Sequence, residues 1–150
     1  MNECKFDALK LANQLCFPLY ACSRETIKLY KPFLNELDLT YTQYITMLVL
    51  WEERSVNVKQ LGKRLYLDSG TLTPLLKKLE SKGLITRVRS ALDERNLIVS
   101  ITPKGEQLRE QALHVPLELA KCVPLTSEEA LTLYQLLYKL LGSLPEDTDE

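Results

Sequence analysis

The chain has 150 residues, a net charge of −1 and a hydrophobic fraction of 45%, values typical of a single soluble domain with its own core. No apolar run approaches the roughly 18 residues that span a bilayer, and no signal-peptide core follows the N-terminus, so we expect a cytoplasmic protein without a membrane segment. The four cysteines form no CxxC pair and His114 is the single histidine. A disulfide scaffold and a metal site are therefore not expected, and no cofactor is predicted.

Helical periodicity dominates the first third of the chain. Apolar residues recur at helical spacing over residues 6–37, and Pro18 and Pro32 are expected to kink or end helices there. Thr40 and Gln43 form a capping box that predicts a helix as far as about residue 53. Asn57 is a candidate cap for a third, short helix.

A fourth helix is predicted to end at Lys82, with Gly83 as its C-terminal stop. Its start is ambiguous. Pro74 would remove a backbone hydrogen bond if Ser69 were the cap, but it would lie harmlessly in the first turn if Thr71 were the cap. The expected core stripe of this helix is Leu72, Leu75, Leu76 and Leu79.

The period then changes to that of strands. Residues 84–89 and 96–101 predict a β-hairpin joined by residues 90–95, with arginines at its distal end. Thr102 and Pro103 begin another helix, which Pro116 and Pro124 are expected to break or bound. A second capping box at residues 126–129 opens a leucine-rich last helix, and an acidic tail follows at residues 145–150.

Two short helices followed by a basic hairpin form the order of a winged helix-turn-helix, here over about residues 41–101. Nine basic and four acidic residues lie between Lys59 and Arg95, a local excess that suits a DNA duplex. The lysines fit a solvated helix face equally well, Arg95 could form a hairpin salt bridge with Asp93, and some winged helices bind protein instead. The candidate DNA-binding residues are Asp68, Ser69, Thr71, Thr73, Lys77, Arg87, Arg89 and Arg95.

Three stretches together resemble the MarR family of bacterial repressors: LDSGTLTPLL at 67–76, LESKGLITR at 79–87 and DER at 93–95. The run NQLCF at 13–17, together with later tyrosines, is similar to the family's organic-hydroperoxide-sensing (OhrR-like) repressors. The resemblance covers nearly the whole chain. It implies one domain over residues 1–150, mainly α with a small β-hairpin wing. It also implies a homodimer built from the helices of about 6–37 and 103–142, bound to a palindromic operator in double-stranded DNA.

The resemblance also assigns roles at the N-terminal helix. It implies that Cys16 is the redox-sensing residue for an organic hydroperoxide and that Tyr30 and Tyr41 activate its thiolate from the partner subunit. Tyr20, one turn after Cys16, would line the same pocket, and apolar neighbours would favour organic peroxides. From the residues alone, a buried and inert thiol is the more common role for such a cysteine.

Cys122 matches the resolving position of the family's two-cysteine members, in which an intersubunit disulfide forms. A small-thiol cap on Cys16 is the alternative, as in one-cysteine members. Cys4 and Cys22 match no family role, and Pro18 departs from the family's pattern and could reshape the pocket.

Three functions compete at this stage. The leading one is a repressor, not an enzyme, that binds its operator when Cys16 is reduced and releases it after oxidation. The second is a MarR-type repressor relieved by a non-covalent aromatic ligand. The third is a thiol peroxidase, which would leave the basic wing unexplained.

Overall fold

The computed structural model describes residues 4–93 and 95–143, so the acidic tail at 145–150 lies outside the described residues. The chain divides into two compact units, Met1–Leu119 and Ala120–Glu150. Within the described ranges, no helix is long and apolar enough to cross a membrane.

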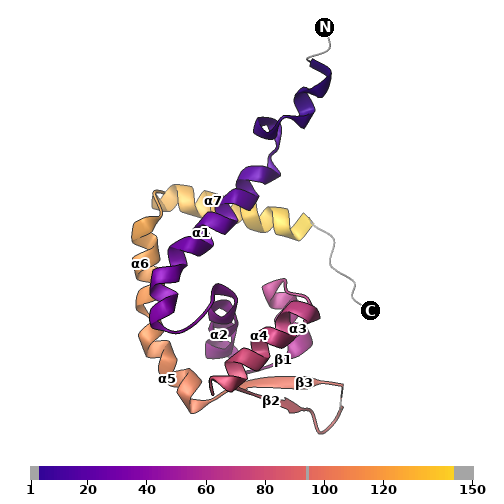
Figure 1. Ribbon diagram of the computed structural model, residues 1–150, viewed down its shortest axis with the longest axis vertical. Helices are drawn as coiled ribbons and strands as arrows, with labels where there is room; N and C mark the ends of the chain where they lie inside the picture. The colour runs from indigo at the N-terminus through magenta and orange to yellow at the C-terminus, as the bar shows by residue number, and fades with distance from the viewer. Residues whose placement is uncertain (1–3, 94, 144–150) are drawn as a thin grey trace. The chain divides into compact units, whose positions relative to one another are not determined.

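The fold is mainly α with one small sheet, which confirms the fold class expected from the sequence (Figure 1). Two 3-10 helices, η1 and η2, precede α1, and the winged helix-turn-helix comprises α2, β1, α3, α4, β2 and β3. The elements are η1 (Cys4–Leu9), η2 (Leu11–Asn13), α1 (Cys16–Glu36), α2 (Tyr41–Glu53), β1 (Ser55–Asn57), α3 (Val58–Leu65), α4 (Ser69–Ser81), β2 (Ile85–Arg89), β3 (Leu97–Ile101), α5 (Pro103–Ala112), α6 (His114–Cys122) and α7 (Ser127–Ser143).

Side-chain caps begin the helices where the sequence predicts them. The Thr40 hydroxyl accepts from the Gln43 amide at 3.3 Å, and the Gln43 side chain accepts from the Thr40 amide at 3.1 Å, which completes a capping box. Asn57 accepts from the amide of Lys59 at 2.8 Å. The predicted caps Thr102 and Thr126 are confirmed in the same way.

Prolines interrupt the helices less than expected. Pro18 is the third residue of α1, where the missing amide would have had no helical partner, and α1 also continues past Pro32 to Glu36. Pro116 does not break or bound α5, because α5 has already ended at Ala112, and Pro116 lies in the first turn of α6. Pro124 follows the end of α6, as predicted.

The helix α4 begins earlier than either expected cap. Asp68 is the N-cap, and its carboxylate accepts from the Thr71 amide at 2.7 Å. Pro74 is therefore inside the helix, where it withholds the hydrogen bond that the Gly70 carbonyl would otherwise accept. At the other end, Gly83 adopts φ +74, as the predicted stop requires.

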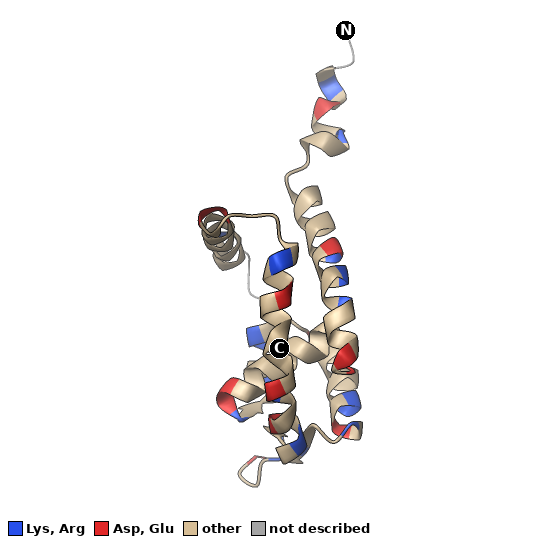
Figure 2. Cartoon of the chain, turned by 90° about the vertical axis from the view of Figure 1, so that its left-hand side faces the viewer, with Lys and Arg blue, Asp and Glu red and all other residues tan. Residues whose placement is uncertain are grey.

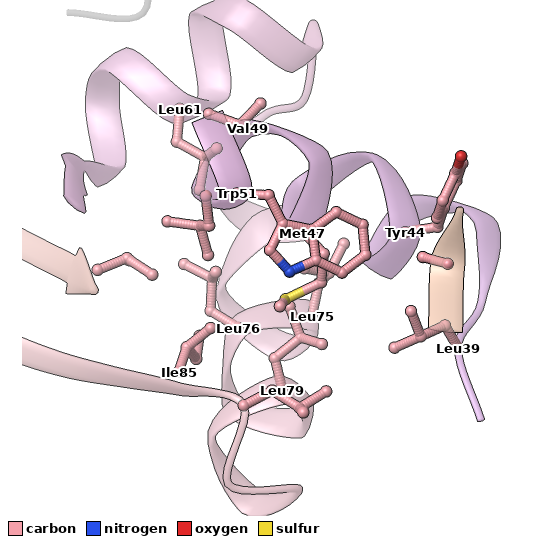
Figure 3. Packing of buried hydrophobic residues seen from close by; sticks show 14 of the residues in the cluster. Leu39, Tyr44, Met47, Val49, Trp51, Leu61, Leu75, Leu76, Leu79 and Ile85 are labelled. Atoms are coloured by element: carbon pink, nitrogen blue, oxygen red, sulfur yellow. The ribbon is translucent and has the colours of Figure 1, made fainter. Parts of the chain in front are cut away.

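The core of the winged helix-turn-helix forms where α2, α4 and the sheet meet (Figure 3). Met47 and Leu50 of α2 are fully buried, and the predicted leucine stripe of α4 is buried with them. Trp51 packs in the same cluster and donates its indole N–H to the carbonyl of Gly105 at 2.9 Å, which fastens α2 to α5.

The sequence does not predict β1. This strand has three residues and contributes one buried side chain, Val56, which is too short for an alternating pattern to show. It pairs with β3, with Val56 opposite Val99. The wing, formed by β2 and β3, therefore belongs to a three-stranded sheet ordered β1-β3-β2.

Candidate nucleic-acid interface and redox site

The N-terminal half of α4 presents the reading surface of the winged helix-turn-helix. Its leucines are buried against α2 and the sheet, so the opposite face is exposed. That face carries short hydroxyl side chains and a lysine that are all exposed, as an approach to base edges and phosphates requires: Ser69, Thr71, Thr73 and Lys77.

Asp68 has a structural task at this surface. The Thr71 backbone amide holds the pKa of its carboxyl below the usual range, so Asp68 is a negatively charged cap. A carboxylate repels phosphates, so the cap is the role that the structure supports for Asp68, and its expected DNA contact stays a prediction.

An ion pair between Glu80 and Arg87, one of the candidate DNA contacts, joins the wing to α4. The Arg87 guanidinium lies 3.1 Å from a carboxylate oxygen of Glu80, and the Arg87 amide donates to the other oxygen at 3.1 Å. Only 19% of the Arg87 side chain is exposed, and its hydrogen bond holds the pKa of Glu80 below the usual range. Arg87 therefore orients the wing, and its expected contact with the minor groove stays a prediction.

Sequence reasoning missed Glu80. No local pattern signals this residue, because its contact with Arg87 depends on how β2 leaves α4. Arg89 and Arg95 remain exposed on the wing. The expected contact between Asp93 and Arg95 exists through the backbone, since the Arg95 amide donates to the Asp93 carboxylate at 3.0 Å.

Lys82 also forms contacts within the protein. Its ammonium lies 3.4 Å from the Asp38 carboxylate and 3.3 Å from the Gln43 side-chain oxygen, and it donates to the Asp38 carbonyl. It therefore fastens the end of α4 to the loop before α2. Lys77 and Lys78 are exposed and stay candidates for phosphate contact.

Cys16 is the first residue of α1 and is exposed. No side chain caps this end of the helix. The expected apolar pocket is not formed by the described part of the protomer, because Leu15, Phe17 and Leu19 are exposed as well.

Tyr20 lies one turn after Cys16 on the same face of α1. Its hydroxyl accepts a hydrogen bond from the Arg24 guanidinium at 2.9 Å, and that guanidinium lies 5.6 Å from the centre of the ring. Sequence reasoning missed Arg24, although the spacing of four residues from Cys16 to Tyr20 to Arg24 was visible.

The other two tyrosines that the sequence singles out, Tyr30 and Tyr41, lie side by side. The rings of Tyr30 and Tyr41 have centroids 4.9 Å apart, and Tyr44, which the sequence did not single out, lies 5.9 Å from Tyr30. Burial raises the pKa of all three phenols, that of Tyr30 to about 12. Each phenol therefore stays protonated at neutral pH and can act as a hydrogen-bond donor.

Tyr30 and Cys16 belong to one helix but to opposite ends of it. They are separated by 14 residues, which is about 21 Å along the helix axis. A phenol hydroxyl cannot span that distance, so the tyrosine cluster can meet Cys16 only on a second copy of the chain.

An alkaline titration tests the burial of the tyrosine cluster. Since the neutral phenol is favoured in the folded protein, the contribution of Tyr30 to stability is complete below pH 10 and is lost as the pH rises through about 12. Tyrosinate absorbance should show a last tyrosine that ionises near pH 12 in wild type and is missing in Tyr30→Phe, and urea unfolding should show stability falling over the same pH range. Ionisation of every tyrosine near its ordinary pKa would contradict the buried cluster.

Cys122 is the last residue of α6 and is exposed. Within the described residues, all four cysteines are exposed thiols, including Cys4 and Cys22, for which no role was predicted. Across the same residues, no group of three His, Cys, Asp or Glu side chains could hold a metal ion.

Comparison with known proteins gives consistent results. A profile described as the transcriptional regulator SarA/Rot family matches residues 28–112. The organic hydroperoxide resistance transcriptional regulator of Bacillus subtilis is 50% identical over 142 residues, which cover 95% of this chain and 97% of that protein.

Solved structures extend the likeness to AbfR of Staphylococcus epidermidis. Reduced AbfR bound to DNA is 36% identical, covers 92% of this chain and 97% of that chain, and has a TM-score of 0.75. Overoxidized AbfR bound to DNA covers 93% and 99% at 36% identity with a TM-score of 0.74, and disulfide-formed AbfR covers 94% and 99% at 37% identity with a TM-score of 0.63.

A mutant of MarR from E. coli complexed with operator DNA shares the fold, with 28% identity over 85% of this chain and 99% of that chain and a TM-score of 0.70. The winged helix-turn-helix, the match of nearly full length and these structures agree with one another. The chain belongs to the MarR family of transcriptional regulators, in the group of the organic hydroperoxide resistance regulators.

Proposed function

We propose that this protein is a redox-sensing transcriptional repressor that works in the cytosol as a homodimer. It binds a palindromic operator in double-stranded DNA while Cys16 is reduced and releases it after an organic hydroperoxide oxidises Cys16. One observation carries the proposal. An exposed thiol stands at an uncapped helix N-terminus on the same chain as a winged helix-turn-helix with an exposed reading face.

The chemistry needs no cofactor. The Cys16 thiolate attacks the terminal oxygen of the hydroperoxide, so that an S–O bond forms as the O–O bond breaks. Sulfur is oxidised by two electrons, and the alkoxide takes a proton from solvent and leaves as an alcohol. The sulfenic acid then condenses with a second thiol to give a disulfide and water.

Exposed apolar side chains support the homodimer. In the first unit they lie along the N-terminal elements, and in the second unit they lie along α7. Large apolar side chains that are exposed along one element mark an interaction surface. Its members include Phe6, Leu9, Leu11, Leu15, Phe17, Leu19, Leu131, Leu133, Leu136 and Leu140. The same dimer would bring Tyr30 and Tyr41 of one subunit to Cys16 of the other.

The second thiol in this proposal is Cys122 of the partner subunit. Cys122 is exposed at the end of a helix, so its thiol is accessible to a sulfenic acid. AbfR supports the route because its overoxidized form is bound to DNA, whereas a disulfide form was solved separately. These two AbfR structures support a disulfide as the releasing step that we propose for this chain.

Operator binding measured before and after cumene hydroperoxide tests the function. Wild type should bind tightly when reduced, lose about 100-fold in affinity when oxidised, and recover with a dithiol, because coupling of this size is usual for two-state switches. Cys16→Ser should bind equally well with and without the peroxide. Continued tight binding by wild type in which every Cys16 has formed the disulfide would refute the switch.

The same samples test the resolving thiol. A non-reducing gel should show a disulfide-linked dimer in wild type and none in Cys122→Ser, which should also stay on the operator when oxidised. A persistent linked dimer would implicate Cys4 or Cys22, and release by Cys122→Ser would point to sulfenic acid or a small-thiol cap. We further propose that the protein is a sensor and not a peroxidase, so repeated turnover with a dithiol should remain negligible.

A further inference from the structure

Tyr66 lies in the turn between α3 and α4, and its backbone has φ 55 and ψ 40, in the left-handed region. The turn requires this conformation, because the Leu67 amide returns to the Gly62 carbonyl of α3 at 3.0 Å. Glycine or asparagine usually fills such a position, since other side chains adopt left-handed angles at a cost. The turn therefore explains the backbone of Tyr66 but not the choice of a tyrosine.

The side chain of Tyr66 contributes little to the packing of the protein. It is 68% exposed, whereas the adjacent Leu67 packs against the core. Across residues 4–93 and 95–143, the phenol of Tyr66 forms no hydrogen bond and no ring contact. A residue that combines a left-handed backbone with an exposed and unpaired side chain points to a function outside the fold.

The position of Tyr66 in the chain indicates what that function is. Ser69 begins α4 three residues later, which is about 10 Å of chain at most. The N-terminal residues of the second helix of a helix-turn-helix contact base edges in the major groove. The turn before that helix therefore approaches the phosphates that border the groove.

The charges near the turn leave a place for a neutral donor. Basic and acidic residues are interspersed over the winged helix-turn-helix, as the mixed blue and red in the lower half of Figure 2 shows. On the last turn of α3, Lys63 is exposed, but Arg64 pairs with two glutamates at the end of α2. A tyrosine hydroxyl is a regular donor to DNA phosphates, and Tyr66 supplies one beside Lys63.

We propose that Tyr66 is a DNA-contacting residue whose hydroxyl donates a hydrogen bond to a phosphate of the operator and so fixes how α4 enters the groove. The proposal rests on the proposed function of the chain as an operator-binding repressor. Glycine would form the same turn with less strain but would supply no donor. The cost of the left-handed tyrosine is therefore a cost in stability that serves binding.

The first test removes the hydroxyl alone from the full-length, reduced protein. The probe is the duplex that reduced wild type selects from a random-sequence library. Tyr66→Phe should bind this duplex about 10-fold more weakly, as the loss of a hydrogen bond to a charged group implies. The dependence of affinity on salt should keep its slope, because a neutral phenol releases no counterion. Unchanged affinity of Tyr66→Phe would overturn the proposal.

Uncharged methylphosphonates, placed at one phosphate of each half-site at a time, locate the contact. At one position, the substitution should weaken wild type clearly more than Tyr66→Phe, since the two changes then remove the same hydrogen bond. Equal losses for both proteins at every position would also overturn the proposal.

Tyr66→Gly separates binding from folding. It should raise the midpoint of urea unfolding, because glycine adopts the left-handed angles freely, and yet it should bind the duplex at least as weakly as Tyr66→Phe. A tyrosine with a purely structural role would show the opposite, with lower stability in Tyr66→Gly. Arg54→Gly makes the same change at another left-handed residue, at the end of α2, and should keep its affinity within about twofold.

Failure of the proposed function is distinguishable from failure of this assignment. Reduced wild type that selects no duplex from the library would refute the repressor itself. Tight binding by wild type together with equally tight binding by Tyr66→Phe would refute only the role of Tyr66.

Discussion

Mixed dimers of two inactive variants should regain peroxide sensing. Tyr30→Phe/Tyr41→Phe should form sulfenic acid at least 10-fold more slowly than wild type, because hydrogen bonds to a charged group are the strong ones. Cys16→Ser should form none. A dimer of one chain of each kind contains one intact site if the tyrosines act across the interface, since the wild-type Cys16 of one chain then meets the wild-type tyrosines of the other.

The expectation follows from the separation of about 21 Å between Tyr30 and Cys16 along α1. Half of the chains in the mixed dimer should react at the wild-type rate, measured by sulfenic acid labelling after refolding of mixed chains with two different tags. The control mixes Tyr30→Phe/Tyr41→Phe with a chain that carries Cys16→Ser and both tyrosine substitutions, which leaves no intact site. Equal, slow reaction in both mixtures would place activation elsewhere.

Among the glycines that the structure describes, Gly105 is the one whose replacement by alanine should lower the stability of the winged helix-turn-helix most. A Cβ at this position would lie 2.3 Å from the Leu84 carbonyl oxygen and 2.8 Å from an Ile101 side-chain carbon. The Gly105 carbonyl also accepts from Trp51, so a shift of α5 away from the sheet would weaken that bond. We expect Gly105→Ala to lower the free energy of unfolding by about 3 kcal/mol, the upper part of the range for overpacking.

Gly142→Ala is the matched control, because a Cβ at Gly142 meets nothing within 4 Å. It should raise the free energy of unfolding by about 0.5 kcal/mol, since alanine is the better helix former. Both variants are compared by urea unfolding at one protein concentration, as the stability of a dimer depends on concentration. Equal stability of the two variants would mean that α5 does not pack against Leu84 as described.

Local patterns made most of the fold predictable. The capping boxes at Thr40 and Thr126 are reciprocal hydrogen bonds between residues three apart, so the sequence contains the whole interaction. The leucine stripe of α4 has the same local character. Pro74 misled the prediction because the Asp68 cap and the buried leucine face of α4 together outweigh one lost backbone hydrogen bond.

The candidate site was likewise predictable only where local patterns define it. The exposure of Ser69, Thr71 and Thr73 could be predicted from the helical period. The pairing of Glu80 with Arg87 could not, because it depends on how the strand leaves the helix. The surroundings of Cys16 were beyond prediction from one chain, since the expected pocket requires surface that a second subunit supplies.

The bond between Glu80 and Arg87 has a consequence for how the operator is read. Because Glu80 accepts from both the amide and the guanidinium of Arg87, the wing and α4 are joined into one unit. We therefore expect oxidation at α1 to change the separation of the two winged helix-turn-helix units of the dimer while each unit keeps its shape. Affinity should fall by a similar factor for every operator variant, and the order of preference among base sequences should survive oxidation.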